Sequence, residues 1–516
     1  MRSWLVPIDN KNMRVLLIEP RNCWMGLNIA LAYLSGALKR AGIEVRVLDL
    51  ANHRQYNAEE MERYFIDNFK PDLIGISLFY IGYYQVIKSI KRIKRLKKVP
   101  IVVGGPQMLI EKEQLLKAVP ELDFAIIGDG EKTLVELCEA LNGKRTFNSI
   151  TGLIYRDGNE VKVNKERELN LDIDLYPFPD YEPFGVKKIR SYQIITSRGC
   201  PYQCTFCFRS SPRWRARSPE NIIEELKLAI DQYAIEEFTI VDDSFNIKPQ
   251  RVIRFCELLK ENQIRLPWRC TGVRADKLPE ELVIKMKDAG CYFISIGIES
   301  FDEKVFNTIN KNESLSQIKE SIGVLKKYKF YVSGYFIIGL PGDTYEKTMN
   351  TYRKAKELGV DEISFAILLP FPGTKIYKTI YSMPGVKKLE NYYNISTVWT
   401  FNPLYSRVRT AFELPEYTAQ EKIDAYNRIR TKEGDPRPPY HKNLFIFGLN
   451  IIFWILKYDF IHFPATLFKV IKNAYRRLVA AKYGRHFYLL DVEYKEEFLK
   501  ELSRICQKEK NRPIYE

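Results

Sequence analysis

Short apolar runs alternate with amphipathic stretches over the first 142 residues of the chain. The runs have the length of buried strands, and they lie at residues 14–19, 44–50, 72–77, 100–103 and 124–127. Between them, residues 85–98 place Val86, Ile87, Ile90 and Ile93 on one helical face. Strands of this kind separated by helices predict a doubly wound parallel sheet. Ligands of such sheets bind at the carboxyl ends of the strands.

A second alternation of strands and helices runs from residue 192 to about residue 373. Its strand patterns cover residues 193–196, 237–241, 268–271, 292–298, 331–338 and 362–368. Helical patterns such as 218–233 and 249–262 fill the gaps, and Pro249 is tolerated in the first turn of a helix. Six such units predict a partial (β/α)₆ barrel, with its chemistry at the carboxyl ends of the strands.

The remaining segments are less regular. Residues 154–159 carry a hairpin turn signal, and Pro177 and Pro179 cannot continue a helix or a central strand. Beyond residue 395 the chain is first polar and irregular, and then rich in aromatic and aliphatic residues and cations. We therefore divide the chain into a first domain (1–142), a linker (143–190), a barrel (191–394) and a mostly helical C-terminal region (395–516).

The composition is that of a folded protein with a basic surface. Hydrophobic residues make up 46% of the chain, and 80 Lys and Arg against 64 Asp and Glu give a net charge of +16. This surplus suits an anionic partner or is only a basic surface, and both interpretations stay open. The nine cysteines are too few and irregular for a disulfide framework. We expect a cytoplasmic protein, because there is no signal-peptide pattern and the longest strong apolar run, residues 444–456, is shorter than a spanning helix.

The most informative segment contains Cys200, Cys204 and Cys207 in the spacing C-x₃-C-x₂-C, directly after the first strand of the barrel. A loop of this length can place three thiolates around one corner of an iron–sulfur cube. Cubane clusters normally take four cysteine ligands, so the missing fourth leaves one iron open. Structural zinc requires a fourth nearby ligand, such as a second C-x₂-C pair, and none follows.

This loop resembles the signature of the radical S-adenosylmethionine (SAM) superfamily, in which an aromatic residue, here Phe206, precedes the last cysteine. The resemblance implies a [4Fe-4S] cluster held by Cys200, Cys204 and Cys207. It also implies that SAM chelates the open iron through its amino and carboxylate groups, and that reductive cleavage gives a 5′-deoxyadenosyl radical. The reductant would be a protein such as flavodoxin or ferredoxin.

The resemblance extends to further residues that would bind SAM. Asp242 and Asp243 follow the second barrel strand, where the family often has Gly-Gly-Glu to hold the SAM amino group. Arg274 follows the third strand and would pair with the SAM carboxylate. Glu299 ends the fourth strand and resembles the carboxylate that binds the ribose or amino group. Ile338 and Gly339 belong to a turn that resembles the one packing on adenine.

The other cysteines form no second cluster motif. Cys256 and Cys291 fit apolar core patterns, whereas Cys23 lies in a loop near the ligand edge of the first domain and could touch a cofactor. The lack of a second cysteine triad argues against the methylthiotransferase branch of the superfamily.

The first domain resembles the flavodoxin-like cobalamin-binding domain found ahead of many radical SAM barrels. Small residues at the strand ends would let a corrin ring approach the backbone. The residues implied for cobalamin are Gly26, Ser77, Gly104, Gly105, Gly128, Asp129 and Glu131. The motif Asp-x-His-x-x-Gly is absent, so we expect no His lower ligand to cobalt. A degenerate domain without any ligand is the alternative.

Residues 441–486 combine apolar runs with eight cations and a single carboxylate, a net charge of +7. This pattern fits an amphipathic segment on an anionic lipid face, peripheral to the inner side of the membrane, and it fits a helical cap on the barrel equally well. A nucleic-acid partner is not expected, because the chain has no recognised binding module.

The resemblance covers about residues 13–375 and implies a cobalamin-dependent radical SAM enzyme. The leading hypothesis is C-methylation of an unactivated carbon in a small-molecule or lipid-like substrate, with methylcobalamin as methyl donor. One alternative is a radical cyclase or oxidase without methyl transfer, similar to the anaerobic magnesium-protoporphyrin ester cyclase. The other is a cobalamin-binding sensor with a vestigial barrel. No catalytic residue is assigned from the sequence.

Overall fold

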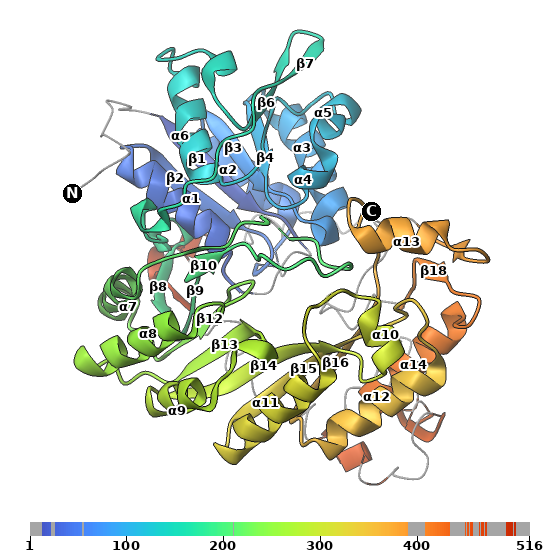
Figure 1. Cartoon of the computed structure of the whole chain (residues 1–516). Helices are drawn as coiled ribbons and strands as arrows, with labels where there is room; N and C mark the ends of the chain where they lie inside the picture. Colours follow the sequence, from blue (N-terminus) through green and yellow to red (C-terminus); the bar gives the residue numbers. More distant parts are fainter. Residues whose placement is uncertain are drawn as a thin grey trace. The chain divides into compact units, whose positions relative to one another are not determined.

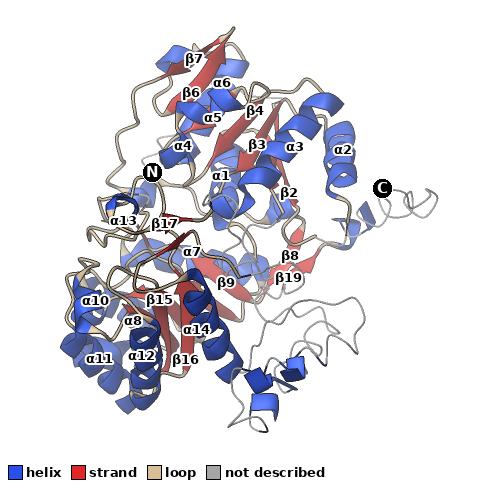
Figure 2. Ribbon diagram, turned by 90° about the vertical axis from the view of Figure 1, so that its right-hand side faces the viewer, coloured by secondary structure: helices blue, strands red, loops and turns tan. Residues whose placement is uncertain are grey.

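The structure is a computed structural model that describes residues 13–21, 26–53, 56–209, 211–390 and 408–433, together with short pieces between residues 449 and 501. Cys23 and much of the segment 441–486 lie outside the described residues. The chain divides into two compact units (Figures 1 and 2). Unit 1 comprises Met1–Arg190, Glu225–Ile235 and Tyr488–Glu516, and unit 2 comprises Ser191–Glu224 and Glu236–Phe487.

Unit 1 is built on a seven-stranded sheet with the order β2-β1-β3-β4-β5-β6-β7. The first five strands are parallel, as the sequence predicts, and are β1 (Arg14–Glu19), β2 (Glu44–Asp49), β3 (Leu73–Ser77), β4 (Ile101–Gly104) and β5 (Phe124–Ile126). The hairpin β6 (Leu153–Asp157) and β7 (Glu160–Val163) adds to β5 in antiparallel sense. The predicted linker 143–190 therefore contains two strands of the sheet, which its turn signal indicated but its assignment as a connector missed.

Helices cover both faces of this sheet (Figure 2). They are α1 (Ile29–Arg40), α2 (Ala58–Phe69), α3 (Tyr83–Leu96), α4 (Met108–Glu111), α5 (Glu113–Ala118) and α6 (Gly130–Leu141). Helix α3 buries Val86, Ile90 and Ile93, which recur at helical spacing, against strand residues such as Ile74 and Ile101. Helices α1 and α6 pack on each other. At the carboxyl end of each parallel strand, a loop leads into the next helix.

The end of the chain returns to unit 1. Strand β19 (Val492–Tyr494) pairs with β8 (Val186–Ile189) in antiparallel sense, and Arg46 forms an ion pair with Glu501 at 2.9 Å. The segment Tyr488–Glu516 therefore belongs to unit 1, whereas the sequence analysis placed it in a C-terminal region that runs over residues 395–516. The sequence could not reveal the difference, because the two paired strands lie about 300 residues apart and neither has a distinctive pattern.

His53, just beyond β2, is buried under this returning segment. Its ring lies 5.0 Å from the ring of Tyr494 and 5.6 Å from that of Phe498, centroid to centroid. Its Nε2 has no hydrogen-bond partner among the described residues. Burial lowers the pKa of His53 to about 4, so the imidazole is neutral in the folded chain.

We expect His53→Phe to make unit 1 more resistant to acid. The unfolded chain protonates this imidazole near its ordinary pKa of 6.5, whereas the folded chain does so only near 4. Because the unfolded state binds more protons between these values, the free energy of unfolding falls as the pH drops through this window, by on the order of 3 kcal/mol. Urea denaturation at neutral pH and near pH 4 measures the difference. A variant that loses stability with acid as steeply as the parent would contradict this assignment.

Unit 2 contains the second predicted sheet. Its six strands are parallel, in the order β16-β15-β14-β13-β12-β9. They are β9 (Ser191–Ile194), β12 (Glu237–Ile240), β13 (Trp268–Val273), β14 (Cys291–Glu299), β15 (Tyr331–Ile338) and β16 (Glu362–Ile367). All six predicted strands are present, and the order along the sheet follows the order along the chain. This is the partial barrel expected from the sequence.

Helices connect the strands of unit 2 (Figure 1). They are α7 (Pro219–Tyr233), shared with unit 1, and α8 (Pro249–Glu261), α9 (Glu280–Asp288), α10 (Glu303–Asn307), α11 (Leu315–Lys327), α12 (Tyr345–Glu357), α13 (Lys375–Ser382) and α14 (Ala419–Lys432). Two short antiparallel pairs, β10 (Ser197–Arg198) with β11 (Arg215–Ala216) and β17 (Lys387–Lys388) with β18 (Phe412–Glu413), complete the described elements. Within the part of the chain that the structure describes, no helix has the length and apolar character needed to cross a membrane.

Candidate functional site

The cysteine loop, residues 199–209, begins at the carboxyl end of the unit 2 sheet and is fixed at both ends. Gly199 adopts φ +79°, and a Cβ there would press on the carbonyl oxygens of Ser211 and Arg213. Only glycine tolerates both conditions. The N–H of Cys200 donates to the Ser211 carbonyl at 3.1 Å. The return strand β11 therefore closes the loop on itself.

The middle of the loop is anchored to two other segments of unit 2. The N–H of Thr205 donates to the carbonyl of Ile309 at 2.9 Å, and the carbonyl of Thr205 accepts from the N–H of Ile376 at 2.9 Å. The side-chain amide of Asn310 donates to the Gln203 carbonyl at 3.3 Å. These hydrogen bonds satisfy backbone groups of the loop and fix its course between the two segments.

The three thiols are close enough to influence one another's pKa. Burial raises the pKa of Cys204 to about 11 and that of Cys207 to about 12, and in both cases Cys200 and Glu299 raise it further. Cys204 and Asp243 act on Cys207 in the same way. Repulsion between neighbouring thiolates is what a positively charged metal centre would relieve.

The donor set is of the kind that iron–sulfur clusters use. Among the described residues, no three His, Cys, Asp or Glu side chains gather as they would around one metal ion. Three cysteines on a single fixed loop are nevertheless the ligand type that iron–sulfur clusters use. Ser244, which the sequence analysis missed, places its Oγ 3.2 Å from the Sγ of Cys200. Hydrogen bonds to cluster sulfurs are one way in which a protein sets the cluster potential.

Glu299 ends β14 in a strained conformation that points its side chain into the site. Its φ is +67°, which is rare for a residue with a side chain, and the pairing with β15 shifts register between Gly297 and Glu299. The carboxylate is buried and lies over Gly297, where a Cβ would overlap its Oε1. Strain of this kind persists where the surroundings hold a side chain for function. Burial raises the pKa of Glu299, and Lys311 partly offsets this.

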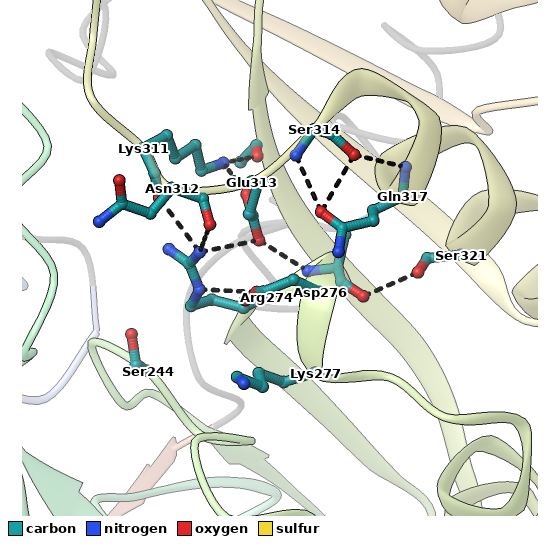
Figure 3. Close-up of polar contacts among 12 residues, drawn as sticks. Ser244, Arg274, Asp276, Lys277, Lys311, Asn312, Glu313, Ser314, Gln317 and Ser321 are labelled. Carbon is teal, nitrogen blue, oxygen red and sulfur yellow. Dashed lines mark hydrogen bonds and ion pairs between the residues drawn. The ribbon is translucent and has the colours of Figure 1, made fainter.

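Lys311 is a buried cation between two carboxylates. Its Nζ lies 3.5 Å from Oε1 of Glu299 and 3.1 Å from Oε2 of Glu313, and it also donates to the carbonyl of Gly297. Although burial opposes the charge, the two carboxylates raise the pKa of Lys311 above its ordinary value. Figure 3 shows Lys311 and Glu313 together with Arg274 and Asp276 in one polar network. The sequence analysis missed Lys311, because no motif marks it.

Arg274 ties this network to the cysteine loop. Its Nε donates to Asp276 at 2.8 Å, and its Nη2 donates to the carbonyls of Lys311 and Asn312, each at 3.1 Å (Figure 3). Its guanidinium carbon stands 3.3 Å from the ring centroid of Tyr202, between Cys200 and Cys204. From the sequence, Arg274 is predicted to pair with the carboxylate of SAM. These protein contacts let Arg274 position the loop, and its pairing with the SAM carboxylate stays a prediction.

The two aspartates after β12 differ in their surroundings. Asp242 is buried and accepts from the N–H and Oγ1 of Thr196 and from the Oγ of Ser197. Burial raises its pKa, and the nearby Arg251 lowers it in part. These bonds join the ends of β9 and β12. Asp243, by contrast, is exposed beside Cys207, so it is the better placed of the two to meet a ligand.

Ile338, which is buried, is the last residue of β15, and the turn that follows begins with Gly339 at φ +87°. Asp343 accepts from the N–H of Gly339 at 2.8 Å and from Oγ1 of Thr348 at 3.0 Å, which closes the turn. The side chain of Lys422, from α14, packs under Gly339 and donates to the Phe412 carbonyl at 3.1 Å. Burial lowers the pKa of Lys422 to about 7. The sequence did not indicate this support, because α14 is 80 residues further along the chain.

Phe206, on the cysteine loop, is half-buried.

In unit 1, most of the residues assigned to cobalamin lie at the carboxyl ends of the strands. Ser77 ends β3 opposite Gly104 of β4, and the amide of Asn28 donates to both Ser77 and Glu19. Gly26 is bound through its N–H and carbonyl to the side chain of Asn52.

The glycines keep this edge open. Among the described residues, a Cβ at Gly128 would meet no atom within 4 Å, and one at Gly104 would meet only Ile126, at 3.9 Å. Gly105 has φ +121° and lies against the Leu78 carbonyl. Such an edge can accept a flat ligand close to the backbone. Asp129 accepts from the hydroxyl of Tyr176 at 2.8 Å, and Glu131 is buried in the first turn of α6.

Comparison with known families gives two matches. The family model described as "Radical SAM superfamily" matches residues 194–355, and that described as "B12 binding domain" matches residues 13–138. The first match covers most of the unit 2 sheet and the cysteine loop, and the second covers the parallel strands of unit 1. Both fall where the sequence analysis expects the corresponding domains.

Among curated proteins, the chain is 31% identical over 393 residues to the uncharacterized methyltransferase PH0819 of Pyrococcus horikoshii, covering 71% of this chain and 83% of the relative. It is 26% identical over 398 residues to the anaerobic magnesium-protoporphyrin IX monomethyl ester cyclase of Cereibacter sphaeroides, covering 71% of this chain and 64% of the relative. Among solved structures, the radical S-adenosylmethionine methyltransferase TsrM of Kitasatospora setae, with cobalamin and a [4Fe-4S] cluster bound, matches at a TM-score of 0.62 and 19% identity, over 73% of this chain and 80% of that chain. At this identity, the likeness to TsrM concerns the fold.

Proposed function

From the premise that the chain belongs to the radical SAM superfamily and carries a B12-binding domain, we propose that it is a cobalamin-dependent methyltransferase that adds a methyl group to an unactivated carbon. The observation that carries the proposal is the fixed three-cysteine loop at the carboxyl edge of a barrel preceded by a cobalamin-type sheet. Family membership makes the chain an enzyme and sets aside the hypothesis of a non-catalytic sensor. The substrate is a small molecule or a lipid-like molecule.

The cofactors are a [4Fe-4S] cluster, SAM and cobalamin. Bound together, they supply a radical that removes a hydrogen atom from the substrate and a methyl group that replaces it. Cys200, Cys204 and Cys207 hold the cluster and leave one iron for SAM. The Oγ of Ser244 lies 3.2 Å from the Sγ of Cys200, where its hydroxyl would donate to a cluster-bound thiolate and stabilise the negative charge. Arg274 holds Tyr202, and with it the loop, in place.

Glu299 and Lys311 present one negative and one positive group at the strand ends, next to the cysteine loop. We assign Glu299 to the ribose or amino group of SAM. Lys311 orients this carboxylate and favours its ionised form against the effect of burial. Asp243 and the turn at Ile338 and Gly339 complete the proposed SAM site.

In unit 1, the open glycines Gly104, Gly105 and Gly128 support close approach of the corrin ring and its nucleotide tail. Ser77 and Gly26 line the same edge through their bonds to Asn28 and Asn52. Asp129 and Glu131, at the start of α6, complete the cobalamin assignment.

We expect Gly297→Ala to weaken SAM binding. The new Cβ would overlap the Glu299 carboxylate and lie 3.2 Å from Nζ of Lys311, so the carboxylate has to shift from the position in which Lys311 holds it. Losing a charge-assisted hydrogen bond of this kind weakens binding roughly tenfold or more. Equilibrium binding of SAM to the reconstituted protein measures the change.

Gly323→Ala is the matched control. Gly323 lies inside α11, and a Cβ there meets nothing within 4 Å. This change should stabilise the helix by up to about 1 kcal/mol and leave SAM affinity as it was. Equal SAM affinity in both variants would contradict the role given to Glu299.

The proposed function is tested with SAM carrying a deuterated methyl group. The protein, reconstituted anaerobically with iron, sulfide and cobalamin, is mixed with a reductant, and the products are analysed by mass spectrometry. We expect 5′-deoxyadenosine, S-adenosylhomocysteine and the deuterated methyl on cobalamin. Formation of 5′-deoxyadenosine without any transfer of label to cobalamin would overturn the methyltransferase proposal.

The same outcome would favour the second candidate, a radical cyclase or oxidase. Its support is the 26% identity to the magnesium-protoporphyrin ester cyclase. Once a substrate is found, its mass separates the two: methylation adds methyl groups, whereas cyclisation or oxidation removes hydrogen. A flavodoxin or ferredoxin is the proposed electron donor in either case.

A further inference from the structure

The described helical residues between 449 and 471 carry an unusual share of exposed apolar side chains. Thirteen residues of this segment are described, and five of them are large hydrophobic residues open to solvent. Phe453 and Phe468 are each 67% exposed and Ile471 is 58% exposed, the highest values for large hydrophobic side chains in the part of the chain that is described. Leu449 and Ile452 complete the set, which we call the apolar patch.

The patch follows helical spacing and is not a random scatter. In the first piece, Leu449, Ile452 and Phe453 fall at positions i, i+3 and i+4, while Ile455 is buried. In the second piece, the exposed residues are Pro464, Phe468 and Ile471, and the buried ones are Thr466 and Val470. Each piece therefore has an inner apolar side that packs on the protein and an outer apolar side that does not.

The charge of the surrounding sequence indicates what covers the outer side. Residues 441–486 contain eight Lys and Arg and one Asp, a net charge of +7. A second copy of the chain would bring an equal positive charge against it, which opposes self-association. An anionic lipid bilayer satisfies both features, since it attracts the cations and takes up the apolar side chains.

We propose that the apolar patch, formed by Leu449, Ile452, Phe453, Phe468 and Ile471, binds the surface of an anionic membrane, with Phe453, Phe468 and Ile471 inserted among the acyl chains. The proposed binding is in the plane of the interface, as is usual for amphipathic helical segments with basic residues. The proposal does not depend on the methyltransferase assignment. It places the enzyme at a surface where a lipid-like substrate would be found.

The test is flotation of the full-length protein with phosphatidylcholine vesicles, with or without phosphatidylglycerol. We expect binding to the vesicles that contain phosphatidylglycerol, and weakening of this binding by added salt. The double variant Phe453→Ser, Phe468→Ser should bind roughly a hundredfold less tightly, because two phenyl side chains no longer leave water. Both side chains are exposed, so the variant should unfold at the parent's temperature.

The control variant is Leu171→Ser, Leu228→Ser, which removes two exposed leucines of unit 1 that lie outside the apolar patch. It should bind the vesicles as the parent does. Binding that is absent, that is equal for both vesicle types, or that survives the double phenylalanine substitution would overturn the proposal. So would a concentration-dependent dimer that the same substitution abolishes while vesicle binding stays absent.

Discussion

Cys204→Ala is expected to abolish both iron binding and SAM cleavage. The thiol stands in the middle of the loop, next to Thr205, whose backbone is bonded on one side to Ile309 and on the other to Ile376. The loop therefore cannot rearrange to offer another donor. The six cysteines other than Cys200, Cys204 and Cys207 lie outside the loop. With two thiolates the cluster loses a ligand that water replaces poorly. Iron and sulfide analysis, together with 5′-deoxyadenosine formation after anaerobic reconstitution, measures the loss.

Cys256→Ala is the matched control for this variant. Cys256 is buried in α8, and burial raises the pKa of its thiol to about 12. It is therefore a core residue and not a ligand. Its replacement should cost some stability through the small cavity left behind but leave the iron content unchanged. Retention of a full iron complement by Cys204→Ala would refute the ligand assignment.

Lys311→Met is the second variant with a large expected effect. Methionine fills a similar volume but leaves the interior carboxylate of Glu299, whose side chain is 9% exposed, without its cation. Glu313, whose side chain is 0% exposed, keeps only Arg274 as a cation. Removing one partner of a buried ion pair costs about 3–5 kcal/mol. We therefore expect a loss of stability of this size in chemical denaturation of the apo-protein. SAM affinity should fall as well, because the Glu299 carboxylate is no longer held.

Two further variants separate these effects. Adding Glu299→Gln to Lys311→Met removes the unpaired charge of Glu299, so it should restore part of the stability without restoring SAM binding. Lys326→Met breaks an ion pair with Asp361 at 2.6 Å whose side chains are about one-third exposed, and it should cost no more than about 1 kcal/mol. If Lys311→Met were as mild as Lys326→Met, the buried network would not have the importance given to it here.

The architecture could be predicted from the sequence because its signals are local. Each strand of the two sheets is a short apolar run, and strands of this kind separated by helices specify a parallel sheet. The order β16-β15-β14-β13-β12-β9 follows directly from six consecutive strand–helix units. The cysteine spacing is equally local, and it was the single most informative feature of the chain.

Long-range contacts could not be predicted in the same way. Lys311 acquires its role only because Glu299 takes a left-handed conformation and Gly297 leaves room for its carboxylate. Arg274 was assigned to a ligand by its position after a strand, whereas its environment contains Asp276, Tyr202 and two carbonyls. A sequence gives the place of such a residue along the chain but not the groups that will surround it.

The most direct test of the central claim is the iron and sulfide content of the full-length protein after anaerobic reconstitution. The account predicts about four iron and four sulfide per chain, the composition of one cubane cluster, with a brown colour that is lost when the three loop cysteines are replaced. Protein that stays colourless and free of iron after repeated loading would contradict it.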